Sequence, residues 1–211
     1  MYLKRIVRGI GLSFLFILLG SLFGYLFRRT LAVQLSVADY GLFFSMIAFF
    51  SFFMLFIDFG LEQAATKYIV EFRLKKQWDH IRSLAASLLK FQLLCSFIFF
   101  LLFFFLSDFL AISYFHASRA ATLLPLLSLL FFIAPLVTFV ATLLLGFQRT
   151  TWYTALDFFR MLFLFLFILL FFSYQPDILG PVLAYAFVNL ILFFFYLPYL
   201  SSFFPSLFTR S

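Results

Sequence analysis

The stretch ATLLPLLSLLFFIAPLVTFVATLLLGF, residues 121–147, runs for 27 residues without a charged side chain. A bilayer core about 30 Å thick is crossed by about 20 apolar residues of α-helix, because each residue adds about 1.5 Å along the axis. The stretch is therefore long enough to cross a membrane. Lipid offers no hydrogen-bond partner to a free backbone group, so such a segment must be helical.

Five further stretches have the same character, and the composition agrees with them. Of the 211 residues, 66% are hydrophobic and 11% are charged, whereas a soluble domain is about half apolar and about a quarter charged. We therefore predict an all-α membrane protein in which residues 1–211 form a single six-helix transmembrane lobe. The expected spans are residues 9–35, 41–66, 83–107, 121–147, 152–173 and 178–200.

The first apolar run has the basic start of a signal peptide, but it ends without a small-residue cleavage site. We interpret it as an uncleaved first span. The basic residues then predict the orientation. Only three of the 15 Lys and Arg residues fall on one side of the six-span arrangement, namely Arg28, Arg29 and Arg119. Because cytoplasmic loops carry the excess of Lys and Arg, we expect both termini in the cytoplasm and the protein in the cytoplasmic membrane.

The net charge of +7 is explained by basic residues at the ends of apolar runs, where they meet lipid head groups. Membrane lipids are therefore expected partners and nucleic acid is not. Much of this charge lies in residues 62–90, which we interpret as a solvated loop between helices that project into the cytoplasm.

Metal sites and enzymatic chemistry find little support in the sequence. Cys95 is the single cysteine, and His80 and His116 stand alone on opposite sides of the expected membrane. Metal sites need clustered ligands, and acid–base catalysis needs a positioned pair of groups. We therefore expect no metal, no cofactor and no enzymatic activity.

Polar residues inside spans are costly in lipid and are functional candidates by default. Asp58 and Glu62 lie one helical turn apart in the second expected span. They must face a polar cavity, lie at the membrane interface, or pair with a cation such as Lys67 or Arg160.

Three further candidates lie in the last two expected spans. Asp157 and Arg160 are three residues apart and can form a local ion pair. Asn189, in the sixth span, can donate a hydrogen bond to another helix.

The first span carries a small-residue motif and two arginines. Gly20 and Gly24 form a GxxxG pattern, which lets two helices approach closely. Arg28 and Arg29 follow near the end of the span. They either extend to the membrane interface or face a cavity, where a guanidinium group can bind an anionic phosphate through paired hydrogen bonds.

Three segments resemble one family of transporters. LFRRTLAVQLSVADYGLFFSMIAFFSFFMLFIDFGLEQAATKYI (Leu26–Ile69) resembles the start of polysaccharide and oligosaccharide-lipid flippases, which belong to the multidrug/oligosaccharidyl-lipid/polysaccharide exporter superfamily. LLLGFQRTTWYTALDFFR (Leu143–Arg160) is similar to the family's turn between helices four and five. GPVLAYAFVNLILFFFYL (Gly180–Leu197) is similar to its sixth helix.

The resemblance implies a fold and a function. Family members place two six-helix lobes around a cavity, which is often cationic, and move a lipid-linked sugar to the outer leaflet by alternating access. Arg29 matches the first-helix arginine of the family, with Arg28 as the alternative register, and both become candidates for binding the substrate phosphate. Asp58 matches an acidic position near the inner end of helix two.

The chain is long enough for one such lobe, so a second six-helix lobe or a homodimer is the expected partner. Two other functions remain open at this point. One is a lobe of a cation-coupled multidrug antiporter, which would need carboxylates inside the membrane. The other is a truncated membrane subunit that does not itself transport.

Overall fold

The computed structural model describes residues 2–174 and 176–203, with side chains described in 9–174 and 176–198. Every regular element in these ranges is an α-helix, as the sequence predicts. Their bounds are α1 Tyr2–Gln34, α2 Val37–Asp58, α3 Leu61–Leu74, α4 Trp78–Phe105, α5 Ser107–Ser113, α6 Ser118–Gly146, α7 Thr150–Phe172 and α8 Leu179–Phe203.

Six of these helices are long and apolar enough to cross a membrane, namely α1, α2, α4, α6, α7 and α8. Large apolar side chains are exposed along them, including Val33, Leu55 and Phe105. Such exposure would be unfavourable in water and is the surface that acyl chains would cover. The protein is therefore a polytopic α-helical membrane protein.

The second expected span is shorter than predicted, because the helix breaks at a glycine. Phe59 and Gly60 both adopt left-handed backbone conformations, with φ of 44° and 75°. These residues end α2 at Asp58, and α3 begins at Leu61. Glycine adopts this conformation without a Cβ penalty, so the Asp58–Phe59–Gly60 sequence favours a helix end here. The prediction of one continuous span over residues 41–66 was wrong.

The predicted solvated loop at residues 62–90 is also wrong, because the segment is a helical hairpin. Only Lys75–Gln77 separate α3 from α4, and α3 packs against both α4 and α6. The Arg73 Nη1 atom donates to the Phe147 carbonyl oxygen at 2.9 Å, just beyond the end of α6. This bond satisfies a carbonyl that the helix leaves without a partner. The charged segment is therefore docked on the bundle.

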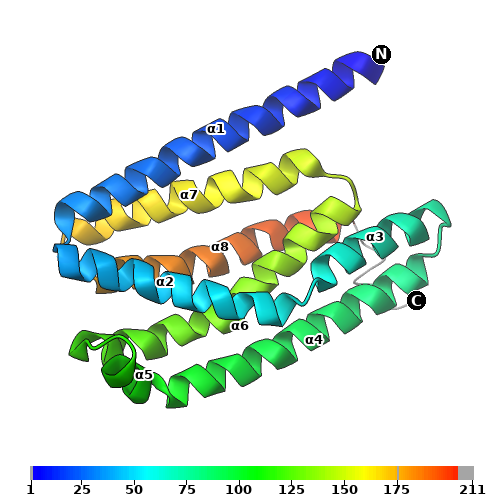
Figure 1. Ribbon diagram of the computed structural model, residues 1–211. Helices are drawn as coiled ribbons and strands as arrows, with labels where there is room; N and C mark the ends of the chain where they lie inside the picture. Colours follow the sequence, from blue (N-terminus) through cyan, green and yellow to red (C-terminus); the bar gives the residue numbers. More distant parts are fainter. Residues whose placement is uncertain (1, 175, 204–211) are drawn as a thin grey trace.

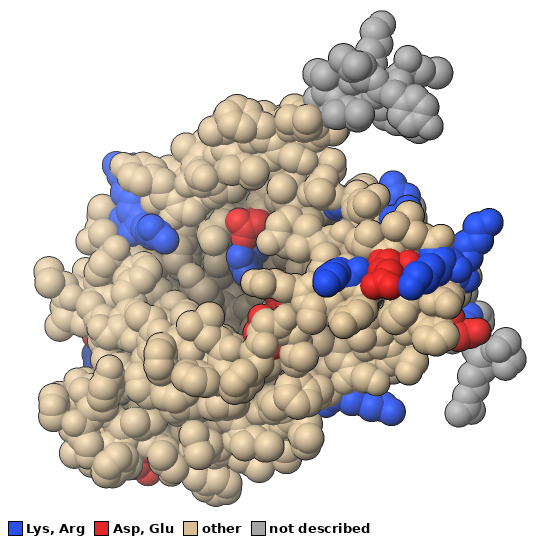
Figure 2. Space-filling view, turned by 45° about the vertical axis from the view of Figure 1, so that its right-hand side comes forward, with Lys and Arg blue, Asp and Glu red and all other residues tan. Residues whose placement is uncertain are grey.

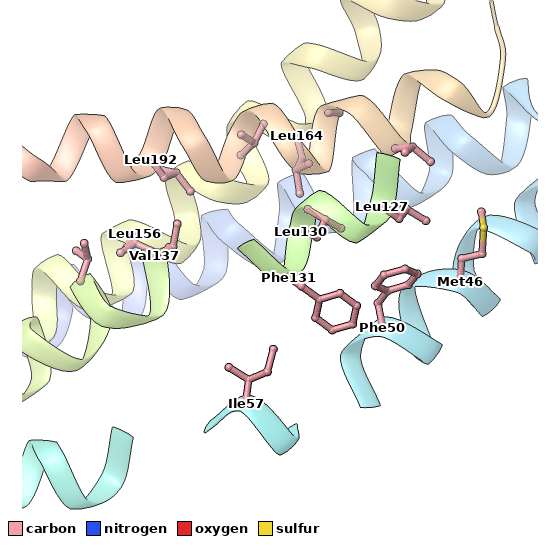
Figure 3. Packing of buried hydrophobic residues seen from close by; sticks show 14 of the residues in the cluster. Met46, Phe50, Ile57, Leu127, Leu130, Phe131, Val137, Leu156, Leu164 and Leu192 are labelled. Atoms are coloured by element: carbon pink, nitrogen blue, oxygen red, sulfur yellow. The ribbon is translucent and has the colours of Figure 1, made fainter. Parts of the chain in front are cut away.

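α6 is the central helix of the bundle. It contacts α2, α3, α4, α5, α7 and α8, and half of the residues in its most apolar stretch are buried. Figure 3 shows Phe131 of α6 facing Phe50 and Ile57 of α2, and the ring centroids of Phe50 and Phe131 lie 4.8 Å apart. The helix continues through Pro125 and Pro135.

The GxxxG pattern of α1 packs against α7, as expected. A Cβ atom at Gly20 would lie 3.4 Å from the Phe158 Cα, and one at Gly24 would lie 3.5 Å from the Met161 sulfur. The two helices run side by side in Figure 1. Glycine thus allows close approach of two backbones.

The connections gather at two ends of the bundle. In Figure 1, α1 begins at the end where α3 joins α4 and α6 joins α7. We call this the basic end, because it carries Lys67, Arg73, Lys75, Lys76 and Arg149. We call the opposite end, where α2, α6 and α8 begin, the clasp end.

Candidate functional site

A polar hollow of about 440 Å³ opens between α6 and α7 and is named here the α7 hollow. Ile17 of α1 and Glu62 of α3 complete its wall. Figure 2 shows acidic and basic atoms inside a hollow, with further Lys or Arg atoms at its left-hand edge and mostly uncharged surface around it. The hollow therefore collects polar groups inside a bundle that is apolar outside.

The one ion pair that lines the α7 hollow is formed within α7. The Arg160 Nη2 atom donates to the Asp157 carboxylate, three residues earlier in the helix. This is the local pair that the spacing predicts. The Arg160 Nε atom is buried and has no hydrogen-bond partner. A buried N–H without an acceptor is costly, so the guanidinium group retains capacity for an anionic ligand.

Asp58 and Glu62 are brought together at the break between α2 and α3. The Asp58 Oδ1 atom accepts the backbone N–H of Glu62 at 3.1 Å and so caps α3, whose N-cap residue Gly60 has no side chain to do so. No ion pair to Lys67, Arg160 or any other cation is formed by either carboxylate within the described residues. Both carboxylates line a cavity, and Asp58 is also the last residue of its candidate membrane span.

The Glu62 carboxylate is half-buried outside the candidate membrane spans. Burial raises the pKa of Glu62 from its ordinary value of 4.5 to about 7, and the neighbouring charge of Asp58 adds to the rise. The direction is that expected for an acid that loses water and gains a negative neighbour. A cation beside Glu62 would relieve both effects.

A second, smaller cavity of about 240 Å³ adjoins this pair, and we name it the hinge cavity. It shares Glu62 and Thr138 with the α7 hollow and adds Gln92 of α4. Gln92 is only 1% exposed, and its Oε1 atom has no hydrogen-bond partner. Sequence analysis missed this residue, although a glutamine inside an expected span is itself a signal.

Arg28 and Arg29, the candidates for phosphate binding, are both exposed near the clasp end of α1. The two arginines lie on different faces of α1. Arg28 continues the line of Gly20 and Gly24 that faces α7, and Tyr185 of α8 lies within electrostatic reach of both Arg28 and Arg160. Arg29 is one residue, or about 100°, farther round the helix. The geometry therefore favours Arg28, the alternative register, as the arginine nearer the interior.

Asn189 is buried in α8, but it does not join two helices. Its Nδ2 atom donates to the Tyr185 carbonyl oxygen at 2.8 Å, one turn earlier in the same helix. The expected bond to another helix is not formed, because the preceding turn offers a carbonyl within reach.

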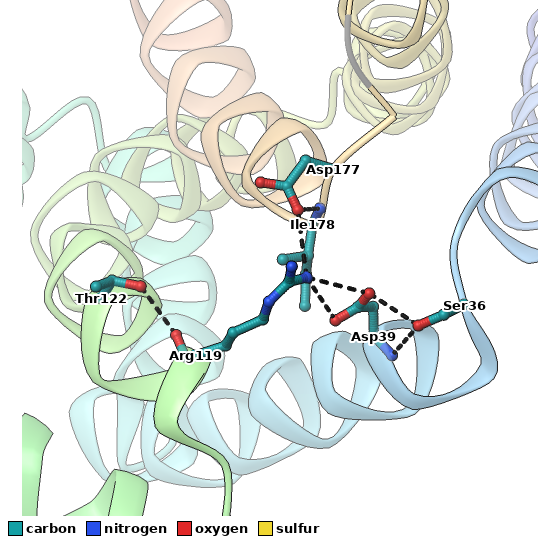
Figure 4. A network of polar contacts seen from close by, with 6 residues as sticks. All are labelled: Ser36, Asp39, Arg119, Thr122, Asp177 and Ile178. Carbon is teal, nitrogen blue, oxygen red and sulfur yellow. Dashed lines mark hydrogen bonds and ion pairs between the residues drawn. The ribbon is translucent and has the colours of Figure 1, made fainter.

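Arg119 joins three helix starts at the clasp end (Figure 4). Its Nη1 atom lies 3.2 Å from the Asp39 Oδ1 atom and 3.6 Å from the Asp177 Oδ1 atom. Asp39 also accepts the Ser36 hydroxyl at 2.8 Å. We call these four residues the clasp. Sequence analysis named Arg119 but did not predict its contact with Asp39, since the two residues are 80 positions apart.

A groove of about 1150 Å³ lies at the clasp end, between α2 and the residues that join α5 to α6. Its walls are mainly apolar, with Phe52 and Tyr114 among the exposed aromatic residues. None of the predicted site residues lines this groove. We therefore place the candidate site in the α7 hollow and the hinge cavity.

In the part of the chain that the structure describes, no group of three or more His, Cys, Asp or Glu residues is placed to hold a metal ion. The titratable groups at the candidate site are the two separate clusters already described, Asp58 with Glu62 and Asp157 with Arg160.

A bundle of six candidate membrane-spanning helices with polar hollows between them defines a polytopic membrane protein, in which buried polar groups are functional candidates. Comparison with known proteins then identifies the family. Residues 6–211 match the family described as polysaccharide biosynthesis protein, so the chain belongs to that family. This membership confirms the resemblance noted in the sequence.

One relative extends the comparison. The chain is 26% identical over 179 residues to an uncharacterised membrane protein of Methanocaldococcus jannaschii. The match covers 81% of this chain and 35% of that protein, so the chain spans about a third of its relative's length. No solved structure matches the chain.

Proposed function

We propose that the chain is one six-helix lobe of a transporter that flips lipid-linked oligosaccharide or polysaccharide precursors across the cytoplasmic membrane by alternating access. The observation that carries this proposal is the guanidinium group of Arg160 in the α7 hollow, inside a bundle with an apolar exterior. Membership in a polysaccharide biosynthesis family supports the substrate class. The protein acts as a carrier in this proposal and makes or breaks no covalent bond.

The substrate has two parts with different chemistry, and the hollow suits the polar part. A phosphate or pyrophosphate would be bound by Arg160, with Arg28 as the next cation toward the clasp end. Arg29 is kept as a candidate on the resemblance alone. Sugar hydroxyls would meet Thr154 and Tyr153 along the wall. The lipid tail would remain among the exposed apolar side chains of the bundle.

The orientation that we propose follows from the charges. The basic end would face the cytoplasm and the clasp end would face outward, since Lys and Arg concentrate at the basic end. The α7 hollow would then be the inward-facing half of the pathway.

A second lobe belongs to the proposal, because one lobe supplies only one wall of a central cavity. Only 11% of the residues in the most apolar stretch of α1 are buried, so this helix offers surface to a partner. A second copy of the chain, or a separate six-helix lobe related by an axis along the membrane normal, would complete the cavity.

The test uses cells that depend on this chain for surface polysaccharide. Outer-leaflet lipid-linked sugar is measured after deletion of the gene and after its return as wild type, Arg160→Gln or Arg28→Gln. The proposal expects loss on deletion, recovery with wild type and at least tenfold weaker recovery with Arg160→Gln. Unchanged outer-leaflet sugar after deletion, in cells without a redundant flippase, contradicts it.

A cation-coupled multidrug antiporter is the second candidate, and the half-buried Glu62 carboxylate favours it. Efflux of a cationic dye that collapses with the ion gradient, in cells with normal glycan export, would support this candidate. A non-transporting subunit would show neither phenotype, and would instead alter the amount or assembly of a partner membrane protein.

A further inference from the structure

The hinge cavity is lined by oxygen-bearing side chains from four different helices, α2, α3, α4 and α6. Asp58 closes α2 and Glu62 opens α3, and the two contribute carboxylates. Thr138 of α6 contributes a hydroxyl whose proton is donated to the Ala134 carbonyl oxygen at 3.2 Å, so its lone pairs remain available. Carboxylate, hydroxyl and amide oxygens are the ligands that hard cations prefer.

Gln92 supplies an independent reason to expect a ligand here. Its side chain is 1% exposed and lines the hinge cavity, and its Oε1 atom is buried without a donor. A buried acceptor without a partner is unfavourable, because it has lost its hydrogen bond to water and gained none in return. The cavity has room for a bound ion with several waters, since a water takes about 30 Å³.

The local backbone also favours positive charge. The last turn of α2 lines the cavity through Met54, Leu55 and Ile57, so the negative end of the helix dipole lies against it. Pro135 also lines the cavity, and because it has no N–H it cannot donate to the Phe131 carbonyl one turn earlier in α6. Broken helix ends and freed carbonyls are the groups that bind Na⁺ in other transporter architectures.

We propose that the hinge cavity is a binding site for a monovalent alkali cation such as Na⁺, held by Asp58, Glu62, Gln92 and Thr138. The cation would join the break between α2 and α3 to α4 and α6. This inference goes beyond the proposed function, because cation binding can be measured whether or not the protein flips a glycan.

The charges around the cavity agree with this assignment. The charge that acts on Glu62 is that of Asp58, and burial and this repulsion together raise the pKa of Glu62. Lys67 is exposed on α3, and Arg160, which also lines the α7 hollow, is paired with Asp157 of its own helix. A cation would therefore bind into a negative site without displacing an ion pair.

Binding is measured on the purified full chain in lipid nanodiscs. Radioactive ²²Na⁺ is titrated at constant ionic strength, with choline chloride replacing NaCl, and thermal unfolding is followed under the same conditions. We expect saturable ²²Na⁺ binding and a Tm that rises with NaCl, because a ligand that binds the folded state stabilises it. No saturable binding, or an equal Tm rise in choline, overturns the proposal.

Matched variants locate the site. Glu62→Gln and Gln92→Leu should each weaken Na⁺ binding at least tenfold. The controls Glu71→Gln, on the exposed end of α3, and Gln63→Leu, also exposed on α3, should bind as wild type does. Wild-type affinity in both cavity variants overturns the assignment.

If a variant fails to fold, a measurement on the wild-type chain still tests the proposal. A hydrophobic carbodiimide modifies carboxyl groups in apolar surroundings, and mass spectrometry identifies the modified residue. Na⁺, but not choline, should protect Glu62 from modification. Equal modification of Glu62 with and without Na⁺ contradicts the proposal.

Discussion

At the clasp end, Arg119 contacts Asp39 and Asp177 and so joins the starts of α2, α6 and α8. Toward the basic end, Asp58 and Glu62 lie one turn apart and form no ion pair among the described residues. Arg119, Asp39 and Asp177 are therefore paired with one another, whereas Asp58 and Glu62 line the hinge cavity without an ion pair among the described residues. The paired charges hold helix ends together, and the two unpaired carboxylates are the better candidates for binding a ligand.

The difference suggests which state the bundle occupies. In the transporter that we propose, a clasp formed at one end with polar cavities toward the other would correspond to a lobe that faces inward. The first prediction concerns the packing of α1 against α7, and the later ones concern one end of the bundle or the other.

The contact between α1 and α7 carries the largest expected effect. Gly20→Leu would push a side chain into the Phe158 backbone, where a Cβ atom alone would lie 3.4 Å from Cα. We expect a loss of about 1–3 kcal/mol in the free energy of unfolding, measured by thermal melting in detergent. Gly11→Leu is the control, because a Cβ atom at Gly11 meets no heavy atom within 4 Å. Equal melting of the two variants would refute the close helix contact.

The ion pair of the α7 hollow comes next. Arg160→Gln should reduce outer-leaflet glycan at least tenfold, or about 1.4 kcal/mol, because a phosphate would lose its guanidinium partner. The matched control is Arg82→Gln, since Arg82 also pairs with an acid three residues earlier and also has a buried Nε atom, but lines neither cavity. Similar losses in both variants would show that charge outside the hollow matters as much.

A substitution at the break between α2 and α3 should have a smaller effect on stability, and the same substitution elsewhere in α2 should have the opposite sign. Gly60→Ala should destabilise the protein by about 1 kcal/mol, because φ at Gly60 is +75°. Gly41→Ala should instead stabilise it by a similar amount, since Gly41 is helical and a Cβ atom there meets nothing. Chemical denaturation compares the two. The account of the break fails if both substitutions shift stability in the same direction.

The clasp has the smallest expected effect on stability. Arg119→Gln should cost less than about 1 kcal/mol, because the Arg119 side chain is 62% exposed and its ion pairs are solvated. Its effect should be on conformation, with residues of the α7 hollow becoming more accessible from the clasp end. Thermal melting measures the first effect and thiol labelling the second. A large loss of stability without altered labelling would make the clasp a purely structural contact.

Sequence patterns predicted the helices well, because apolar length is a local property. The chain between residues 121 and 147 could be assigned without any partner, and α6 spans Ser118–Gly146. The α2–α3 break was missed, although Gly60 stood inside the expected span. A single glycine inside an apolar helical pattern is a weak signal for a helix end, and the packing of α3 on α6 is not visible in a short stretch of sequence.

Four of the seven residues that the sequence predicts for the site line the two cavities, whereas Arg28, Arg29 and Asn189 line neither. Asp58, Glu62, Asp157 and Arg160 were named from polarity alone, and all four line the two cavities. Gln92 was not named, since its importance comes from burial beside Glu62. The clasp was missed for the same reason, because Asp39 and Arg119 meet only when α2 and α6 are packed.

The most direct test asks which side of the membrane the α7 hollow faces. Thr154→Cys, in the hollow, and Ser118→Cys, exposed at the clasp end, are each made in a Cys95→Ala background and treated with a membrane-impermeant thiol reagent. We predict that Thr154→Cys is labelled in inside-out vesicles and that Ser118→Cys is labelled in right-side-out vesicles. Labelling of both variants from the same side would contradict the account.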